Sequence, residues 1–244
     1  MNTVSHSLIC VNDIEIQIDR KDIKNLHVGV YPPHGKVRVA SPLHIDDEAV
    51  RLAIISKLSW IKKQKLSFDE QPRQTKREML SGESHYFLGK RYLLDVIYRS
   101  GKHEIIKKHS KLQLYVRANT TVEKRQLVLN EWYRKELKKE ASKLISKWEG
   151  ILGVLVDSWE IKRMRTKWGS CNNASKKILL NLELVKKPIE CVEYIIVHEM
   201  IHFYERHHND NFKNLMDRYI PNWKHTRELL NRSILGFEEW DRYY

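Results

Sequence analysis

An apolar segment in the last third of the chain carries two histidines and a glutamate close together near its C-terminal end. Residues 189–203 read IECVEYIIVHEMIHF, so His198, Glu199 and His202 lie among isoleucine, valine and methionine. A helix that is apolar on nearly all sides is buried in a protein core. Burying two imidazoles and a carboxylate is unfavourable unless they meet hydrogen-bond partners or an ion. The chain must therefore fold around this helix and bring a compensating group to it.

The spacing of the two histidines favours a metal ion as that group. His198 and His202 are four residues apart, which on a helix separates their side chains by about 40° and one turn of rise, so both can reach one ion. Glu199 faces the same cleft without being required as a ligand. In zinc peptidases the glutamate of an HExxH motif takes a proton from water, whose pKa the metal lowers to about 7. The competing interpretation is a pair of core histidines that have hydrogen-bond partners and no metal.

A catalytic zinc site needs a third protein ligand and one open position. His208 comes six residues after the second histidine. Metzincins have the same spacing, but their turn contains a glycine where this chain has Glu205, so the turn must be made in another way. By spacing alone, the third ligand can also be His207. It can also be a carboxylate on a later helix, such as Asp217 or Glu228.

Alternating apolar and polar residues predict strands through the first half of the chain. These segments are 14–19, 26–31, 36–40, 85–88, 91–98, 103–107 and 112–116, with a turn at 32–35. One helix is predicted from residue 46 to about residue 68, a polar linker over 69–82, and a long helix over roughly 121–149. Two further strands, 159–171 and 177–186, precede the HEMIH helix, which is predicted to begin at Pro188, and two more helices follow it.

This order of elements predicts an α+β fold. We expect a β-rich N-terminal region with one helix, 1–118, and a zincin-like C-terminal region with the HExxH helix, 119–244. The two regions form separate domains or one continuous domain. No internal repeat is apparent in the sequence.

Composition and charge narrow the protein class. The chain of 244 residues has a net charge of +13 and 31% charged residues, which predicts a soluble globular protein. Its basic surface either attracts nucleic acid or is a solvated surface without a partner. The lysines are spread along the chain, however, and do not gather in one arm. Three widely spaced cysteines form neither a disulfide framework nor a CxxC zinc motif, so we expect a reducing cytoplasm. We expect no membrane span and no secretory signal.

Three segments carry a resemblance to a known family. They are RTKWGSC at 165–171, ILLNLELV at 178–185 and VHEMIHFYERHHNDNF at 197–212. In these segments the sequence resembles the YgjP-like metallopeptidases, which are similar to the SprT and WLM proteins. WIKKQK at 60–65 and FLGKRYLLDV at 87–96 agree more loosely, so the likeness covers nearly the whole chain but has strong motifs only in its last third.

The resemblance implies a metal site and its residues. It implies His198, His202 and His208 as ligands of one zinc ion, or of another divalent transition metal, and Glu199 as the general base. It selects His208 over His207, which falls at a variable position of the family. Lys213 departs from the family pattern, which often has tryptophan directly after the residue that corresponds to Phe212.

The basic segment before Cys171 is predicted to form a wall of the substrate site. Gly169 allows close backbone approach, and Trp168 can line a pocket. Arg165 and Lys167 can place positive charge near a developing oxyanion. The competing interpretation puts Trp168 in the core and both cations on a solvated face. Asn181, inside an apolar strand, needs hydrogen-bond partners and is expected to support this wall or a neighbouring backbone, whereas Cys171 and Cys191 are expected to be buried thiols.

The leading hypothesis is a zinc-dependent metallopeptidase acting on a peptide or protein substrate, which adds as a strand to an edge of the 159–186 hairpin. An alternative is a metal-dependent nucleotide phosphohydrolase, although no phosphate-binding loop or paired-carboxylate magnesium motif is present. A DNA-associated protease of the SprT-like type is a third hypothesis, based on charge and analogy. A structural zinc site is disfavoured because such sites are usually rich in cysteine. The sequence has no signal for an oligomeric state.

Overall fold

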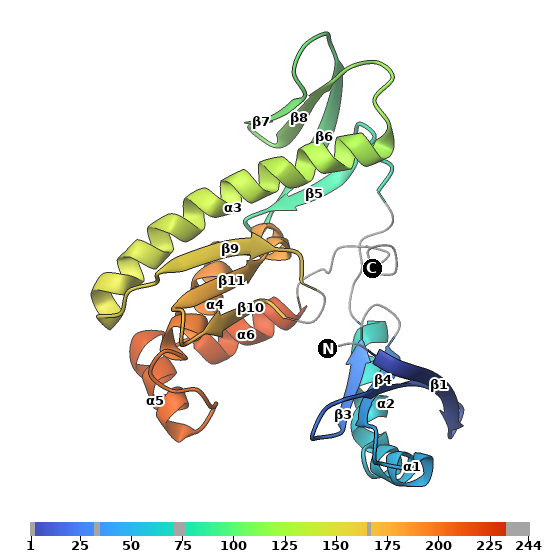
Figure 1. Ribbon diagram of the computed structural model, residues 1–244. Coiled ribbons are helices and arrows are strands. Elements are labelled where there is room, and N and C mark those ends of the chain that lie inside the picture. The colour runs from blue at the N-terminus through green and yellow to red at the C-terminus, as the bar shows by residue number, and fades with distance from the viewer. Residues whose placement is uncertain (1–2, 32–34, 71–76, 165–166, 233–244) are drawn as a thin grey trace. The chain divides into compact units, whose positions relative to one another are not determined.

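The computed structural model describes residues 3–31, 35–70, 77–164 and 167–232 (Figure 1). The chain divides into two compact units, Met1–Gln71 and Pro72–Tyr244. This boundary lies in the predicted linker 69–82, of which 71–76 lie outside the described residues, as do 32–34 of the predicted turn. The sequence-based division into 1–118 and 119–244 stays a prediction. The predicted α+β class is confirmed, since both units combine sheets and helices.

The first unit is a four-stranded sheet followed by two helices. Its strands are β1 (Thr3–Val11), β2 (Ile14–Lys21), β3 (His27–Tyr31) and β4 (Lys36–Pro42). They lie in the order β1-β2-β4-β3, and the central pair β2 and β4 is parallel. Inward-facing residues of the sheet and helices form a separate core, which includes Ile16, Ile18, Val37, Val39, Val50, Ile54 and Ile61.

The prediction of a single helix over residues 46 to about 68 is wrong, because the structure has two helices there. α1 (Asp47–Ser56) begins after Asp46, whose carboxylate accepts a hydrogen bond of 2.7 Å from the Ala49 N–H. It ends where the Lys57 N–H bonds to the Ile54 carbonyl at 2.9 Å, a tighter turn than the α-helical one. α2 (Leu58–Glu70) then continues the chain. The strand β1 is also absent from the sequence-based prediction.

The second unit begins with a sheet of the same topology. β5 (Ser84–Phe87), β6 (Lys90–Tyr98), β7 (Glu104–Lys108) and β8 (Lys111–Val116) lie in the order β5-β6-β8-β7, again with a parallel central pair. In each unit a helix follows the last strand of the sheet. This structural repeat is not apparent in the sequence. Strand pairing requires that apolar and polar residues alternate, but it does not require the same residues at equivalent positions of the two sheets.

The rest of the second unit builds layers around a long helix, α3 (Val122–Leu152). A three-stranded sheet consists of β9 (Ser158–Lys162), β10 (Gly169–Asn172) and β11 (Lys177–Asn181), in the order β10-β11-β9. A 3₁₀ helix, η1 (Leu182–Lys186), and three α-helices follow: α4 (Ile189–Ile201), α5 (Asp210–Tyr219) and α6 (Trp223–Arg232). α3 contacts β7 and β8 as well as η1 and α4, so it lies between the four-stranded sheet and the C-terminal layer (Figure 1).

Two strand predictions in this region are wrong. The predicted strand 159–171 is divided into β9 and β10, and the predicted strand 177–186 ends at Asn181. Both changes involve the Asn181 amide, which donates to the carbonyls of Met164 and Lys167 at 2.8 Å and accepts from the Glu183 N–H at 3.2 Å. These side-chain bonds replace the ladder bonds that a continuous strand would make.

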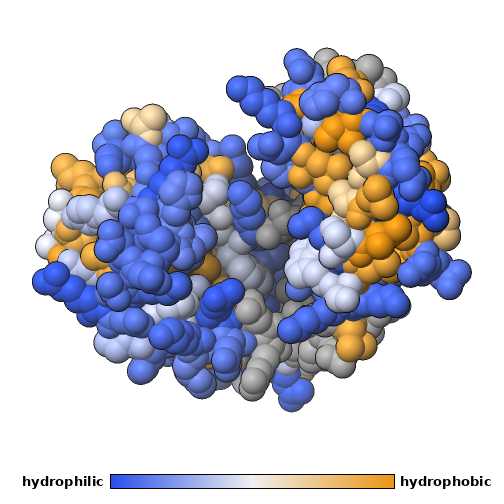
Figure 2. Space-filling view, turned by 90° about the horizontal axis from the view of Figure 1, so that it is seen from below, coloured by the Kyte–Doolittle hydropathy of each residue, from blue (hydrophilic) through white to orange (hydrophobic). Residues whose placement is uncertain are grey.

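The surface mixes charged and apolar residues. Hydrophilic residues cover most of the face in Figure 2, with apolar side chains between them. In the first unit the large apolar residues with exposed side chains include Leu43, Leu52 and Ile55. Among the described residues, no helix is both long and apolar enough to cross a membrane.

The core position of α3 can be tested with two leucines of that helix. Leu137 is 0% exposed and Leu127 is 52% exposed. We expect Leu137→Ala to lower the free energy of unfolding of the second unit by about 2–5 kcal/mol, because it leaves a cavity between the two layers. Leu127→Ala is the matched control and should change it by less than about 0.5 kcal/mol. Urea denaturation followed by tryptophan fluorescence measures both, and equal effects would contradict the layer arrangement.

Candidate active site

The helix α4 places the HEMIH motif at the centre of the second unit. Most of its residues are buried, and His198 and Glu199 lie in its last turn. His202 follows directly as the C-cap residue. In the structure, a largely buried helix thus carries His198 and Glu199, and His202 caps its end. Pro188, predicted as its first residue, precedes it at the N-cap position.

The chain reverses direction after α4 without a glycine. The N–H groups of Tyr204 and Glu205 both bond to the Ile201 carbonyl, at 2.9 and 3.0 Å. The Tyr204 hydroxyl donates to the Leu152 carbonyl at the end of α3, which attaches the turn to the core. The Glu205 carboxylate accepts from the His207 N–H at 3.1 Å. Side-chain and backbone hydrogen bonds therefore make the turn that a glycine makes in metzincins.

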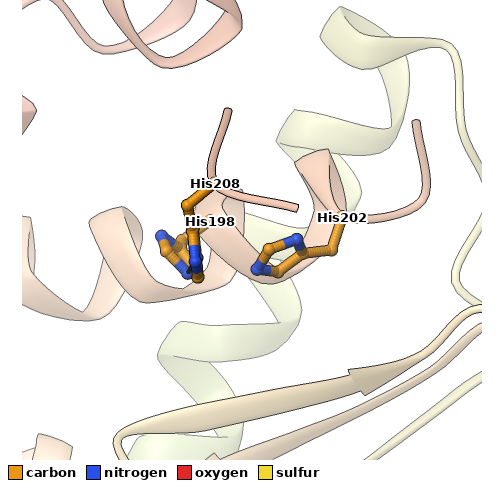
Figure 3. Close-up of side chains that lie close together, drawn as sticks. All are labelled: His198, His202 and His208. Carbon is orange, nitrogen blue, oxygen red and sulfur yellow. Dashed lines mark hydrogen bonds between the residues drawn. The ribbon is translucent and has the colours of Figure 1, made fainter. Parts of the chain in front are cut away.

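This turn brings three imidazoles together. One nitrogen from each of His198, His202 and His208 lies within 4.8 Å of the others, and the Nε2 atoms of His198 and His208 are 3.0 Å apart. Figure 3 shows the three rings turned toward one another. The ring of Phe212, in the first turn of α5, packs against all three, with centroid distances of 4.7–4.9 Å.

The donor set fits a transition metal ion. A tetrahedral zinc ion with bonds of about 2.0–2.1 Å holds its nitrogen ligands about 3.3 Å apart, close to the observed separation of 3.0 Å. Burial lowers the pKa of His198 to about 3 and also lowers that of His208, so both imidazoles are neutral, which is the form that binds metal. His202 Nδ1 lies 2.9 Å from the Glu205 carbonyl oxygen, which orients this ring and leaves its Nε2 for an ion.

The alternative ligands raised by the spacing are not in this cluster. Among the residues that the structure describes, the group that could hold an ion comprises His198, His202 and His208. Asp217 instead accepts a hydrogen bond of 2.7 Å from the Trp223 indole. Neither His207 nor Glu228 belongs to the group.

Glu199 is buried beside this cluster and is closely packed against β10. Its side chain is 6% exposed, and burial raises its pKa to about 7, while Lys167 and the Cys171 thiol act in the opposite direction. A Cβ atom added to Gly169 would lie 2.6 Å from the Glu199 Oε1 atom. The backbone of Gly169 therefore forms a wall directly against this carboxylate.

Asn181 holds the segment that leads into this wall. Besides the two carbonyl bonds described above, its backbone N–H donates to the Trp168 carbonyl at 2.9 Å. Trp168 packs against the core and also lines the cleft, and its role in a substrate-site wall stays a prediction. Lys167 is exposed, whereas Arg165 lies outside the described residues.

The cleft has a volume of about 890 Å³ and contains the three histidines, Glu199, Trp168 and Gly169. Among the lining residues that sequence reasoning missed are Tyr194, Arg206 and Arg227. Tyr194 precedes His198 by one helical turn, a spacing that could have identified it. Arg227 comes from α6, and no local pattern in the sequence connects it with the motif.

The two cysteines of this region are poor nucleophiles. Burial is the main cause that raises the pKa of Cys171 and of Cys191 to about 11. Cys191 is fully buried, and Cys171 is partly buried and lines the cleft next to Glu199. Both thiols are therefore protonated at neutral pH.

Comparison with known proteins identifies the family. A family model described as YgjP-like, metallopeptidase domain, matches residues 25–233. No curated protein matches. Two crystal structures of metallopeptidase zymogens are similar over part of the chain, each with a TM-score of 0.34. Jannalysin of Methanocaldococcus jannaschii is 25% identical, over 37% of this chain and 87% of that protein. Abylysin of Pyrococcus abyssi is 19% identical, over 38% of this chain and 90% of that protein. Because the family model spans most of the sequence, the chain belongs to the YgjP-like metallopeptidases and is a metal-dependent peptidase.

Proposed function

We propose that this chain is a zinc-dependent peptidase of the zincin type, in which His198, His202 and His208 hold one zinc ion and Glu199 is the general base. The observation that carries the proposal is the convergence of three imidazole nitrogens within 4.8 Å in the cleft that contains the buried Glu199. A catalytic zinc site has three protein ligands and a fourth position that is open to a cleft. In a structural zinc site, protein ligands fill all four positions. The zinc would supply a Lewis acid and lower the pKa of water to about 7.

Glu199 moves the proton in this mechanism. Its carboxylate takes the proton from the water that attacks the scissile carbonyl, and it gives that proton to the leaving amine nitrogen. The contact with Gly169 restricts where the carboxylate can lie. The hydrogen bond of His202 Nδ1 with the Glu205 carbonyl and the packing of Phe212 hold the imidazoles in place.

The strand β10 is the element that we assign to the substrate. It lies at one end of the three-stranded sheet and pairs with β11 on one side. Its residues from Gly169 to Asn172 line the cleft beside Glu199. An extended peptide that pairs with the outer edge of β10 would pass directly over the histidine cluster, and main-chain hydrogen bonds would hold it there.

The role of Glu199 is tested by Glu199→Gln. We expect the variant to keep the metal content of the wild type and to lose at least about 100-fold in the rate of peptide hydrolysis, because the amide cannot accept the proton. Metal analysis and turnover of a quenched fluorescent peptide measure the two quantities. Glu190→Gln, which changes an exposed residue of the same helix, should leave both unchanged. Hydrolysis by Glu199→Gln at the wild-type rate would refute the assignment.

The contact between Gly169 and Glu199 makes a second prediction. We expect Gly169→Ala to lower kcat by at least about tenfold, because the new methyl group must displace the carboxylate from its position. The metal content should stay at the wild-type level. Gly150→Ala is the matched control, since a Cβ atom at Gly150 would meet no atom within 4 Å. If Gly169→Ala retains full activity, the position of Glu199 does not depend on this contact.

The third ligand is tested with the adjacent histidines. His208→Ala should weaken zinc binding by more than the 10- to 100-fold that is typical for loss of an outer-shell partner, because it removes a donor of the cluster. His207→Ala should bind zinc as the wild type does. Competition with a chromophoric chelator measures both affinities. A loss of affinity in His207→Ala together with normal affinity in His208→Ala would reverse the assignment.

A further inference from the structure

Three cationic side chains converge on the cleft from separate parts of the second unit. Lys167 precedes β10, Arg206 lies in the turn after α4, and Arg227 lies on α6. All three are exposed at the cleft. Among the described residues that line it, Glu199 is the one carboxylate. The cleft therefore has an excess of positive charge before any metal is bound.

Several other lysines of the unit form ion pairs with acidic side chains. Lys147 pairs with Glu193 at 2.7 Å, Lys177 with Glu160 at 2.5 Å and Lys186 with Glu183 at 2.7 Å. Within the described part of the chain, no ion pair involves Lys167, Arg206 or Arg227. Unpaired cations that face a cleft are available to an anionic group of a ligand.

The charges of two of these cations act on different groups of the site. The charge of Arg227 acts on His198 and His208. The charge of Lys167 acts instead on Glu199 and Cys171. An anion bound by either one would therefore lie within a few residues of the scissile bond of a peptide placed along β10.

We propose that the cleft selects peptides that carry a carboxylate close to the scissile bond, with Arg227, Arg206 and Lys167 as the specificity-determining residues. The inference deepens the proposed peptidase function and rests on it. A guanidinium presents a planar set of donors that matches a carboxylate, and two of the three cations are arginines. Three cations within one cleft suit a short acidic segment better than a long polyanion, which needs an extended basic stripe. The carboxylate can belong to an aspartate or glutamate side chain or to the C-terminus of the substrate.

Binding of matched peptides tests the inference without requiring hydrolysis. The probes are fluorescein-labelled peptides with glutamate on both sides of an apolar pair and their glutamine counterparts, each with a free or an amidated C-terminus. The full chain carrying Glu199→Gln is titrated, with and without added zinc, and anisotropy gives Kd. We expect the glutamate peptide to bind about five- to tenfold more tightly, and this preference should shrink as salt increases. A preference that follows the free C-terminus and not glutamate would assign the carboxylate to the chain end.

Variants of the cations connect the preference to the cleft. In Glu199→Gln, the second substitution Arg227→Gln should reduce the preference to about twofold, and Arg206→Gln and Lys167→Gln should reduce it in part. Lys224→Gln is the matched control, because it removes the same charge from the same helix but does not line the cleft. Equal Kd values for glutamate and glutamine peptides, or a preference unchanged in all three cleft variants, would overturn the proposal. An oligonucleotide that binds more tightly than the acidic peptide and depends on Arg227 would also overturn it.

Hydrolysis by the wild type separates the two proposals. If both peptides are cleaved with the same kcat/KM, the peptidase function holds and the carboxylate preference is wrong. If neither peptide is cleaved but the glutamate peptide binds more tightly through Arg227, the carboxylate preference holds and the peptidase mechanism is wrong.

Discussion

Burial of charged and polar groups on α4 is the constraint on which the second unit depends. The surrounding core removes His198 and Glu199 from water. Burial lowers the pKa of His198 and raises that of Glu199, so the neutral form of each side chain is favoured. Such groups are unfavourable in a core unless other groups or an ion compensate them. The turn after α4, the first turn of α5 and the strand β10 all direct backbone or side chains at this helix. An ion held by the proposed ligands would therefore be part of how the core satisfies its own polar residues.

Backbone hydrogen bonds made by side chains hold the parts of the site in place. The Asn181 amide donates a hydrogen bond to the Lys167 carbonyl in the segment before β10, and it accepts one from the Glu183 N–H at the start of η1. Tyr204 attaches the turn that presents His208 to the end of α3. In both cases a side chain accepts or donates where regular secondary structure would otherwise continue, and the chain changes direction at that point. These bonds attach both segments to the rest of the unit, although the candidate ligands come from a helix and a loop.

Local patterns predicted the helix with HEMIH, the alternating strands and the α+β class, because these depend on the periodicity of apolar residues. The same reasoning failed at Lys57, where one helix becomes two, and at 159–171 and 177–186, where strands end early. Those failures involve bonds between residues distant in sequence or a single tighter turn, which periodicity does not contain. The candidate ligands followed from spacing and family resemblance, but Tyr194, Arg206 and Arg227 in the same cleft did not.

The amino-acid sequence by itself determined that a buried helix would carry two imidazoles and a carboxylate on neighbouring positions, because helical geometry follows from spacing alone. Family resemblance then distinguished His208 from His207. The folded chain decided how the turn without glycine brings His208 to within 3.0 Å of His198, and why position 169 must lack a side chain. It also decided that Lys167, Arg206 and Arg227, which come from separate segments, line the cleft. Such features depend on packing between distant segments, and no local pattern specifies which distant segments will meet.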